Sequence, residues 1–203
     1  MIKTALYSKV KDYDFEKLFK KKGYVFFTNG KYNLNIIGIR SAGAQLTNSF
    51  DDLLVLIYKT PNGEWNRQIY QITTDPGQHY VLNPVSRKGT AILVPGQYRG
   101  CWEIGKHRGK YLALCQCKPV KVYRDSNKDE IYDYDPKTLE EGLFGINIHK
   151  AGYNSKRVDT WSAGCQVFAV NSEFIRFMEY CKKQVASGHG DKFTYTLIRE
   201  EDL

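Results

Sequence analysis

The sequence predicts a mainly β fold of the sandwich or barrel kind, with one long C-terminal helix and a short N-terminal helix. From residue 35 to residue 124, short apolar or alternating runs recur between turn signals such as Pro61-Asn62-Gly63 and Asp75-Pro76-Gly77. One apolar stripe with helical spacing lies near the C-terminus. Of the 203 residues, 42% are apolar and 14% aromatic, which is enough to bury a core.

The N-terminal part predicts one helix and one strand. Residues 13–22 place three apolar side chains on one helical face, and an aspartate at position 12 or 14 can cap the helix. A strand over residues 23–27 is expected to end at the turn signal Asn29-Gly30. We therefore expect a small N-terminal extension over residues 1–32, followed by one larger domain over residues 33–203.

Strand patterns continue along the larger domain. Predicted strands cover residues 35–40, 53–59, 67–73, 91–94, 111–117 and 120–124, and a last strand covers 192–198. Between them, Ser172–Ala186 predicts the long helix, with Asn171 or Ser172 as its cap and Gly188 beyond its end. Cys181 lies on the apolar stripe of this helix and is expected in the core.

Charge and hydropathy restrict the function class. The formal charge of +8 favours general attraction to a polyanion, such as an anionic cell wall, over a dedicated nucleic-acid module. No helix-turn-helix, zinc-finger or aromatic RNA-binding pattern is present, so no sequence-specific nucleic-acid partner is expected. No apolar run approaches the ~18 residues of a membrane span. Met1 to Val10 are not followed by the apolar segment of a signal peptide, so synthesis in the cytoplasm is expected.

A histidine and a cysteine carry the main chemical signal. His149 precedes Cys165 by 16 positions, and a thiol becomes a strong nucleophile when a nearby imidazole takes its proton. Gly164 allows a sharp turn that aims amide groups at a developing oxyanion, and Ser162 can brace the turn or the imidazole. We hypothesise a low pKa for the Cys165 thiol. The alternatives are an inert buried cysteine and a core histidine.

These segments resemble the L,D-transpeptidase (YkuD-type) catalytic domain, in particular a phage-borne branch, over roughly residues 33–198. Ile148-His149-Lys150-Ala151 is similar to the histidine segment of that family, and Ser162-Ala163-Gly164-Cys165 to its cysteine segment. Thr74-Asp75-Pro76-Gly77-Gln78-His79-Tyr80 is similar to the start of a family strand. Ala163 stands where the family has a second histidine. Gln166 and Val167 replace its usual asparagine or arginine, and both departures concern substrate positioning.

The resemblance implies an L,D-transpeptidase fold and catalytic domain over residues 33–203 and a cysteine-dependent hydrolase of peptidoglycan stem peptides. Cys165 would attack the carbonyl of an L-centre, while the N–H groups of Gly164 and Cys165 would hold the oxyanion. His149 would be the base, with its other ring nitrogen donating to a carbonyl near Lys150 or Ala151.

The cellular role follows from the same resemblance. We expect a phage lytic or virion-associated enzyme that acts at the bacterial cell wall, with other virion proteins as possible partners. Two alternatives stay open: true transpeptidation to an amine, and a catalytically inactive wall-binding or structural phage protein.

Trp161, Tyr98 and Arg99 are candidates for substrate binding, although packing explains them as well. His79 and His107 show no partner pattern and are expected to be surface or core residues.

A second candidate site is a calcium loop. Asp125, Asn127, Asp129 and Asp133 place side-chain oxygens at alternate positions, as calcium loops do. However, Glu130 replaces the usual turn glycine and Pro136 stands where a bidentate glutamate would follow, so a solvated acidic hairpin is the alternative. The cysteine chemistry requires no cofactor, and a structural calcium is the one metal that the sequence suggests.

Overall fold

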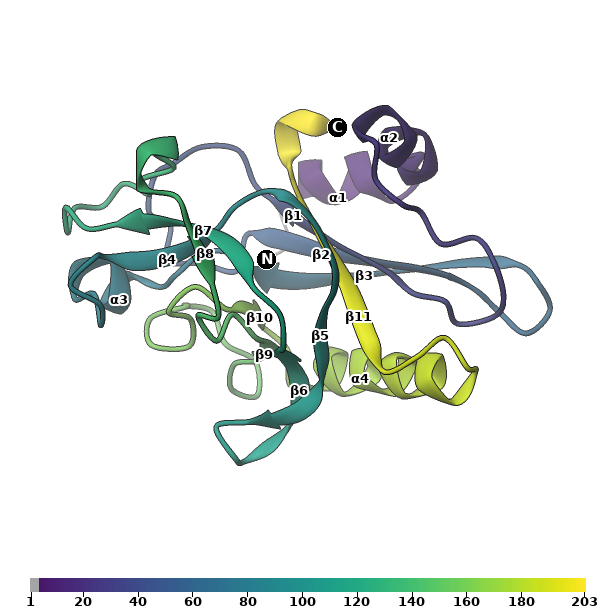
Figure 1. Cartoon of the computed structure of the whole chain (residues 1–203). Helices are drawn as coiled ribbons and strands as arrows, with labels where there is room; N and C mark the ends of the chain where they lie inside the picture. The colour runs from purple at the N-terminus through teal and green to yellow at the C-terminus, as the bar shows by residue number, and fades with distance from the viewer. Residues whose placement is uncertain (1–3) are drawn as a thin grey trace.

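A closed barrel of eight strands forms the centre of this computed structural model, which describes residues 4–203 (Figure 1). The order around the barrel is β1-β11-β5-β6-β9-β10-β3-β2. These strands are β1 (Asn35–Arg40), β2 (Asp52–Lys59), β3 (Trp65–Thr73), β5 (Gly96–His107), β6 (Tyr111–Gln116), β9 (Ile148–Lys150), β10 (Gln166–Phe168) and β11 (Lys192–Arg199). A three-stranded sheet of β4 (Thr90–Leu93), β7 (Val120–Asp125) and β8 (Glu140–Gly142) lies beside it. The prediction of a mainly β fold is confirmed as a barrel.

The helices lie outside the barrel (Figure 1). They are α1 (Thr4–Val10), α2 (Phe15–Lys22), α3 (Gln78–Leu82) and α4 (Asn171–Ala186), with 3-10 turns η1 (Pro136–Thr138) and η2 (Glu200–Asp202). The predicted C-terminal helix is confirmed as α4, and Cys181 is fully buried in the core that α4 shares with the barrel. Within residues 4–203, no helix has the length and apolar character needed to cross a membrane.

Strands β1 and β2 are apolar on both faces, which explains their continuous hydrophobic runs. One face carries Ile36, Leu54 and Leu56 into the main core, where they join aromatic side chains from other strands and from α4. The other face carries residues such as Ile37 and Val55, which pack against the N-terminal helices. Residues 4–22 therefore share a hydrophobic cluster with the barrel rather than projecting from it.

The N-terminal helix expected from the sequence is α2, and α1 was not predicted. Asp14 is the cap of α2, since its side chain accepts from the Lys17 N–H at 3.0 Å. At its other end, Lys22 forms an ion pair of 2.7 Å with Asp202 of η2. Figure 1 shows the two N-terminal helices side by side next to the C-terminus.

The strand predicted over residues 23–27 is wrong. The backbone there has no strand partner; instead the Gln97 side chain accepts from Val25 N–H and donates to Val25 O, both at 2.9 Å. Asn35 holds Phe27 in the same way. Amide side chains thus replace a sheet ladder, while Phe26 packs edge-on against Phe19 at 5.4 Å.

Further elements differ from the sequence prediction, which also did not include the short strands β8, β9 and β10. Residues 78–82, within the segment expected to begin a family strand, form the short helix α3. The long strand β5 was not predicted, because it lacks a clean alternation. It contains Gly100 at φ 61° and meets β11 with a register shift, so inward and outward positions change along its length.

Candidate active site

The structure brings Cys165 and His149 onto one face of the barrel wall. β9 and β10 run parallel, and Val167 lies opposite His149. Cys165 stands directly before β10 and packs in one cluster with Val167, whose side chain lies on the same face as that of His149, and its Sγ accepts from the Asn147 N–H. Strand spacings of ~4.8 Å and ~3.3 Å per residue place the two Cα atoms about 8 Å apart. The nucleophile and base predicted from sequence are therefore diagonal neighbours.

Ser162 and Gly164 shape the turn that presents Cys165. The Ser162 hydroxyl donates to the Cys165 carbonyl at 2.8 Å and accepts from the Gly164 N–H at 3.1 Å. Gly164 has φ 116°, which favours glycine. Of the two roles expected for Ser162, the structure shows that it braces the turn.

The hydrogen bond from the Gly164 N–H to the Ser162 hydroxyl corrects the predicted oxyanion hole. Because the Gly164 N–H already donates to Ser162, it is not free to hold an oxyanion, and that part of the prediction is wrong. Within residues 4–203, the Cys165 N–H has no acceptor. It is therefore one amide of the turn that a substrate oxygen could use.

The Cys165 thiol rests between two backbone groups of the preceding segment. Sγ accepts from the Asn147 N–H at 3.5 Å and donates to the Gly145 carbonyl at 3.4 Å. Burial raises the pKa of the Cys165 thiol to about 11, and the Asn147 N–H and Arg108 offset only part of this effect. The hypothesis of a low thiol pKa is therefore wrong for the resting site.

His149 is buried, with 3% of its surface exposed, and its ring orientation is fixed. Nδ1 lies 2.9 Å from the Lys150 carbonyl, which also accepts from the Tyr111 hydroxyl at 3.2 Å. Burial, followed by the neighbouring His107, lowers the pKa of His149 to about 3, so the ring is neutral at pH 7. Nδ1 carries the proton and Nε2 is the basic nitrogen, which confirms the predicted bond to a carbonyl near Lys150.

His107 is the residue of this site that sequence reasoning missed. Its ring stacks on His149 with centroids 4.0 Å apart and planes at 23°. Its Nδ1 lies 3.1 Å from the Asn147 side-chain nitrogen. His107 lies at the end of the unpredicted strand β5, and no spacing in the sequence links it to His149.

Of the predicted substrate-binding residues, Trp161 lies near the site. It is 43% exposed and borders a pocket of about 380 Å³ whose wall also includes Tyr111, Lys150 and Tyr153. Since Tyr111 contacts His149, this pocket adjoins the base. A second pocket of about 370 Å³ includes Ala163, next to the cysteine turn.

The structure does not bring Tyr98 and Arg99 to the site. The Tyr98 hydroxyl donates to the Val94 carbonyl at 2.7 Å, and its ring lies edge-on to the core residue Trp102. Arg99 is exposed and lies eight residues before His107 along β5. Both therefore belong to the other end of that strand.

In the proposed calcium loop, several side-chain oxygens accept from the loop's own backbone, whereas within residues 4–203 Asp125 Oδ1 is buried and has no hydrogen-bond partner. Asn127 Oδ1 accepts from the Asp129 N–H, and Asp129 Oδ1 accepts from the Ile131 N–H at 2.8 Å. Asp125 is fully buried and accepts from the Asp133 N–H. In the described part of the chain, no group of three His, Cys, Asp or Glu side chains is placed to hold a metal. Calcium binding by these residues stays a prediction.

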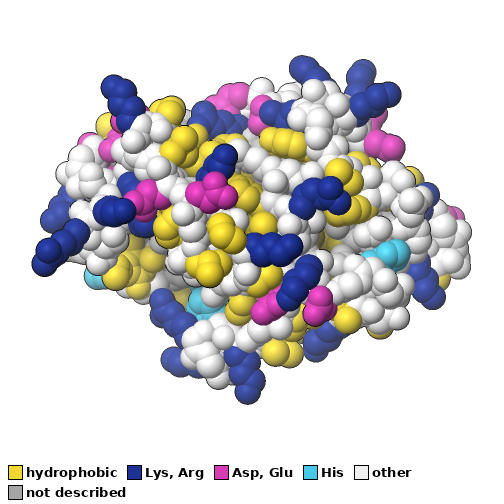
Figure 2. All heavy atoms as spheres, in the orientation of Figure 1, with side chains coloured by type: hydrophobic (Ala, Val, Ile, Leu, Met, Phe, Trp, Pro, Cys, Tyr) yellow, Lys and Arg dark blue, Asp and Glu magenta, His cyan; other side chains and the backbone are white. Residues whose placement is uncertain are grey.

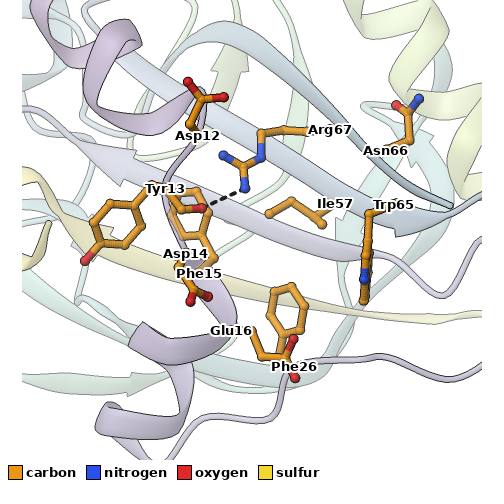
Figure 3. Close-up of a pocket in the computed structure, with 10 residues that line it drawn as sticks. All are labelled: Asp12, Tyr13, Asp14, Phe15, Glu16, Phe26, Ile57, Trp65, Asn66 and Arg67. Atoms are coloured by element: carbon orange, nitrogen blue, oxygen red, sulfur yellow. Dashed lines mark hydrogen bonds between the residues drawn. The ribbon is translucent and has the colours of Figure 1, made fainter.

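Another pocket, of about 400 Å³, lies away from Cys165, between the N-terminal segment and the β2–β3 hairpin (Figure 3). Arg67 extends across it and donates to the carbonyls of Val10, Lys11 and Tyr13, at 2.6 to 2.7 Å. The guanidinium is thus used to hold the N-terminal segment to β3.

Basic side chains are spread over the face seen in Figure 2 and alternate there with apolar and acidic side chains. On this face they form no continuous stripe.

Comparison with known proteins assigns no family to the chain. No protein-family model, no curated protein and no solved structure matches it. A functional assignment therefore rests on the geometry around Cys165 and on the sequence resemblance.

Proposed function

We propose that this protein is a cysteine-dependent hydrolase of peptidoglycan stem peptides, with chemistry of the L,D-transpeptidase type. The placement of Cys165 directly before β10, diagonally across from His149 on the neighbouring parallel strand β9, carries the proposal. The hydrogen bond from His149 Nδ1 to Lys150 supports it, because it leaves Nε2 free to accept a proton.

In the proposed reaction, Cys165 Sγ gives its proton to His149 Nε2 as sulfur attacks the carbonyl carbon of an L-centre. The Cys165 N–H stabilises the oxyanion of the tetrahedral intermediate. His149 then returns the proton to the leaving amine as the C–N bond breaks, which leaves a thioester on Cys165. Water attacks the thioester, with His149 accepting one proton and returning it to sulfur, so the acid product leaves and the thiol is restored.

The resting state is a neutral thiol and a neutral imidazole. The pKa of Cys165 is about 11 and that of His149 about 3, so a preformed thiolate–imidazolium pair is disfavoured. Proton transfer therefore accompanies attack, as in general base catalysis, rather than preceding it.

The pockets beside the turn suit a peptide that carries carboxylates. Lys150 lines the pocket that includes Trp161; Arg124 lines the pocket that includes Ala163 but is already paired with Glu140 at 2.8 Å. Stem peptides enter such sites as anionic chains, and the charge of +8 favours approach to an anionic wall. Together with the resemblance to a phage-borne branch, this supports a lytic or virion-associated role at the cell wall.

A second candidate is an inactive wall-binding or structural phage protein. It is favoured by the raised pKa of the thiol and by the engaged Gly164 N–H, both of which oppose catalysis. True transpeptidation uses the same site with an amine in place of water.

Mass spectrometry of purified stem peptides incubated with the protein tests the assignment. We expect loss of a residue or fragment with wild type, none with Cys165→Ala, and full activity with Cys117→Ala, a second free cysteine, as the matched control. Added D-amino acid separates hydrolysis from transpeptidation. A stem peptide that has incorporated the D-amino acid indicates transfer to an amine, and a free acid product alone indicates hydrolysis by water. Sedimentation with intact peptidoglycan in which both wild type and Cys165→Ala bind, without turnover by either, would establish the binding role.

A further inference from the structure

Four neighbouring strands place the reactive groups on one outer face. In register, His107 pairs with Tyr111 between β5 and β6, and Leu114 pairs with Ile148 between β6 and β9. The second pairing puts Ala113 opposite His149, because the two strands are antiparallel. His107 and His149 are thus separated by the whole width of β6.

Small residues allow the two rings to meet across that strand. On the face shared by His107 and His149, β5 carries Gly105 and β6 carries Ala113, which are paired with each other. Ala113 is fully buried. A larger side chain at Ala113 would fill the space through which His107 extends to stack on His149, while a Cβ on Gly105 would meet the Cys115 side chain at 3.2 Å.

Asn147 fixes the His107 ring. Its Oδ1 accepts from the Gln116 N–H at 2.9 Å, so its Nδ2 is the atom that faces His107 Nδ1, at 3.1 Å. Nδ2 donates, and His107 Nδ1 therefore accepts and carries no proton. The backbone N–H of the same Asn147 donates to Cys165 Sγ. One residue thus connects the thiol to the stacked rings.

We propose that His107 is a positioning residue for His149. Its ring, oriented by Asn147, fixes the plane of the His149 imidazole so that Nδ1 stays on the Lys150 carbonyl and Nε2 remains the free base. The inference rests on the proposed function, in which His149 takes the proton of Cys165. His107 itself touches neither substrate nor the reacting atoms.

The charged and titratable groups that affect His149 are few. Arg108, in the β5–β6 turn, and His107 both disfavour a positive charge on His149. Tyr111 on β6 contacts Nδ1, and the ammonium group of Lys150 lies over the Tyr111 ring and donates to Asn171. The stacked His107 is therefore the group in direct contact with the His149 ring face.

Nitrogen and carbon NMR of the imidazole rings tests the proposal without any substrate. The chain has four histidines, so each can be assigned by substitution. We expect His149 of the wild type to show one tautomer with the proton on Nδ1. In His107→Ala we expect a mixture of tautomers and a slower Cys165 alkylation, by about tenfold, because the free base is no longer held in place. His107→Phe keeps the stacked ring. It should therefore restore the single His149 tautomer and bring the Cys165 alkylation rate to within about threefold of wild type.

Asn147→Asp provides a second variant of nearly the same volume. The carboxylate still accepts from Gln116 but has no hydrogen for His107 Nδ1, so His107 should move its proton to Nδ1 and the His149 signals should shift. His79→Ala, at an exposed position on α3, is the control. Unchanged His149 signals and alkylation rates in both His107→Ala and Asn147→Asp would overturn the proposal. His149→Ala tests the proposed function separately: if Cys165 alkylation is unchanged in this variant, His149 is not the base. The NMR comparison of wild type with His107→Ala tests the positioning role independently of that result.

Discussion

Gly164 and Ala91 lie in direct backbone contact: a Cβ atom on Gly164 would come within 2.2 Å of the Ala91 carbonyl oxygen. This contact joins the cysteine turn to β4, the first strand of the small sheet. The turn is thus confined from outside by a neighbouring strand and from inside by Ser162, which explains how Cys165 is held without a disulfide or a metal.

Gly164→Ala should destabilise the protein well beyond the cost of its backbone angle. Gly63→Ala is the matched control, since Gly63 also has a positive φ, of 83°, but nothing lies within 4 Å of its Cβ position. We expect the free energy of unfolding to fall by roughly 1 kcal/mol in the control. In Gly164→Ala it should fall by roughly 1–3 kcal/mol more, because the Ala91 backbone must move. Urea unfolding measures both. Equal losses in the two variants would contradict the contact.

The Cys165 thiol should titrate later than an ordinary thiol. Since burial raises its pKa to about 11, its rate of alkylation should still rise steeply above pH 9, where a free thiol with a pKa of ~8.5 is already mostly ionised. Mass spectrometry of the Cys165 peptide, with glutathione as the reference, gives the profile. A plateau near pH 8 would indicate that the thiolate is stabilised by a group that this structure does not place there.

His149 should make stability depend on pH on the acidic side. Its pKa is lowered from 6.5 to about 3 on folding, so between these values the unfolded chain binds more protons and stability falls as pH falls. The contribution of neutral His149 to the free energy of unfolding is fully present above pH ~6.5. It is lost as pH falls towards 3, at a rate that approaches ~1.4 kcal/mol per pH unit.

His149→Asn is the comparison for this effect, because its amide nitrogen can replace Nδ1 as donor to Lys150 but does not titrate. Buried carboxyls such as Asp52 are common to both proteins, so the difference in unfolding free energy isolates His149. Parallel curves from pH 7 to pH 4 would show that His149 is not buried as a neutral ring.

The sequence predicted most of the barrel, because hydrophobic periodicity reports burial directly. β1, β2, β3 and α4 were located to within about two residues, since β1 and β2 carry continuous apolar runs, α4 carries an apolar stripe, and β3 ends in the alternating buried residues Tyr70 and Ile72. Residues 23–27 show the limit of that signal: Phe26 is half-buried against Phe19 of helix α2, Val25 is exposed, and the backbone bonds of Val25 and Phe27 go to amide side chains. Alternation alone does not distinguish the two arrangements.

Only those site residues that lie in local sequence motifs could be predicted. Cys165, Gly164 and His149 lie in short segments whose local pattern carries the chemistry, so they could be chosen from the sequence. His107 could not, because its relation to His149 depends on the register of three strands and on the small size of Ala113. The raised pKa of Cys165 likewise follows from burial by distant segments, which no local motif encodes.

Trp161 and Tyr98 should separate substrate binding from stability. Trp161 is 43% exposed at the pocket beside Tyr111, so Trp161→Ala should raise KM about fivefold, the loss of ~1 kcal/mol of aromatic contact, with little change in unfolding. Tyr98→Phe removes hydroxyl bonds to the Val94 and Lys121 carbonyls and should cost ~1 kcal/mol of stability while KM stays unchanged. Steady-state kinetics on stem peptides and urea unfolding of both variants decide the matter. A KM effect for Tyr98→Phe equal to that of Trp161→Ala would mean that the substrate extends along β5, far beyond the pocket that adjoins His149.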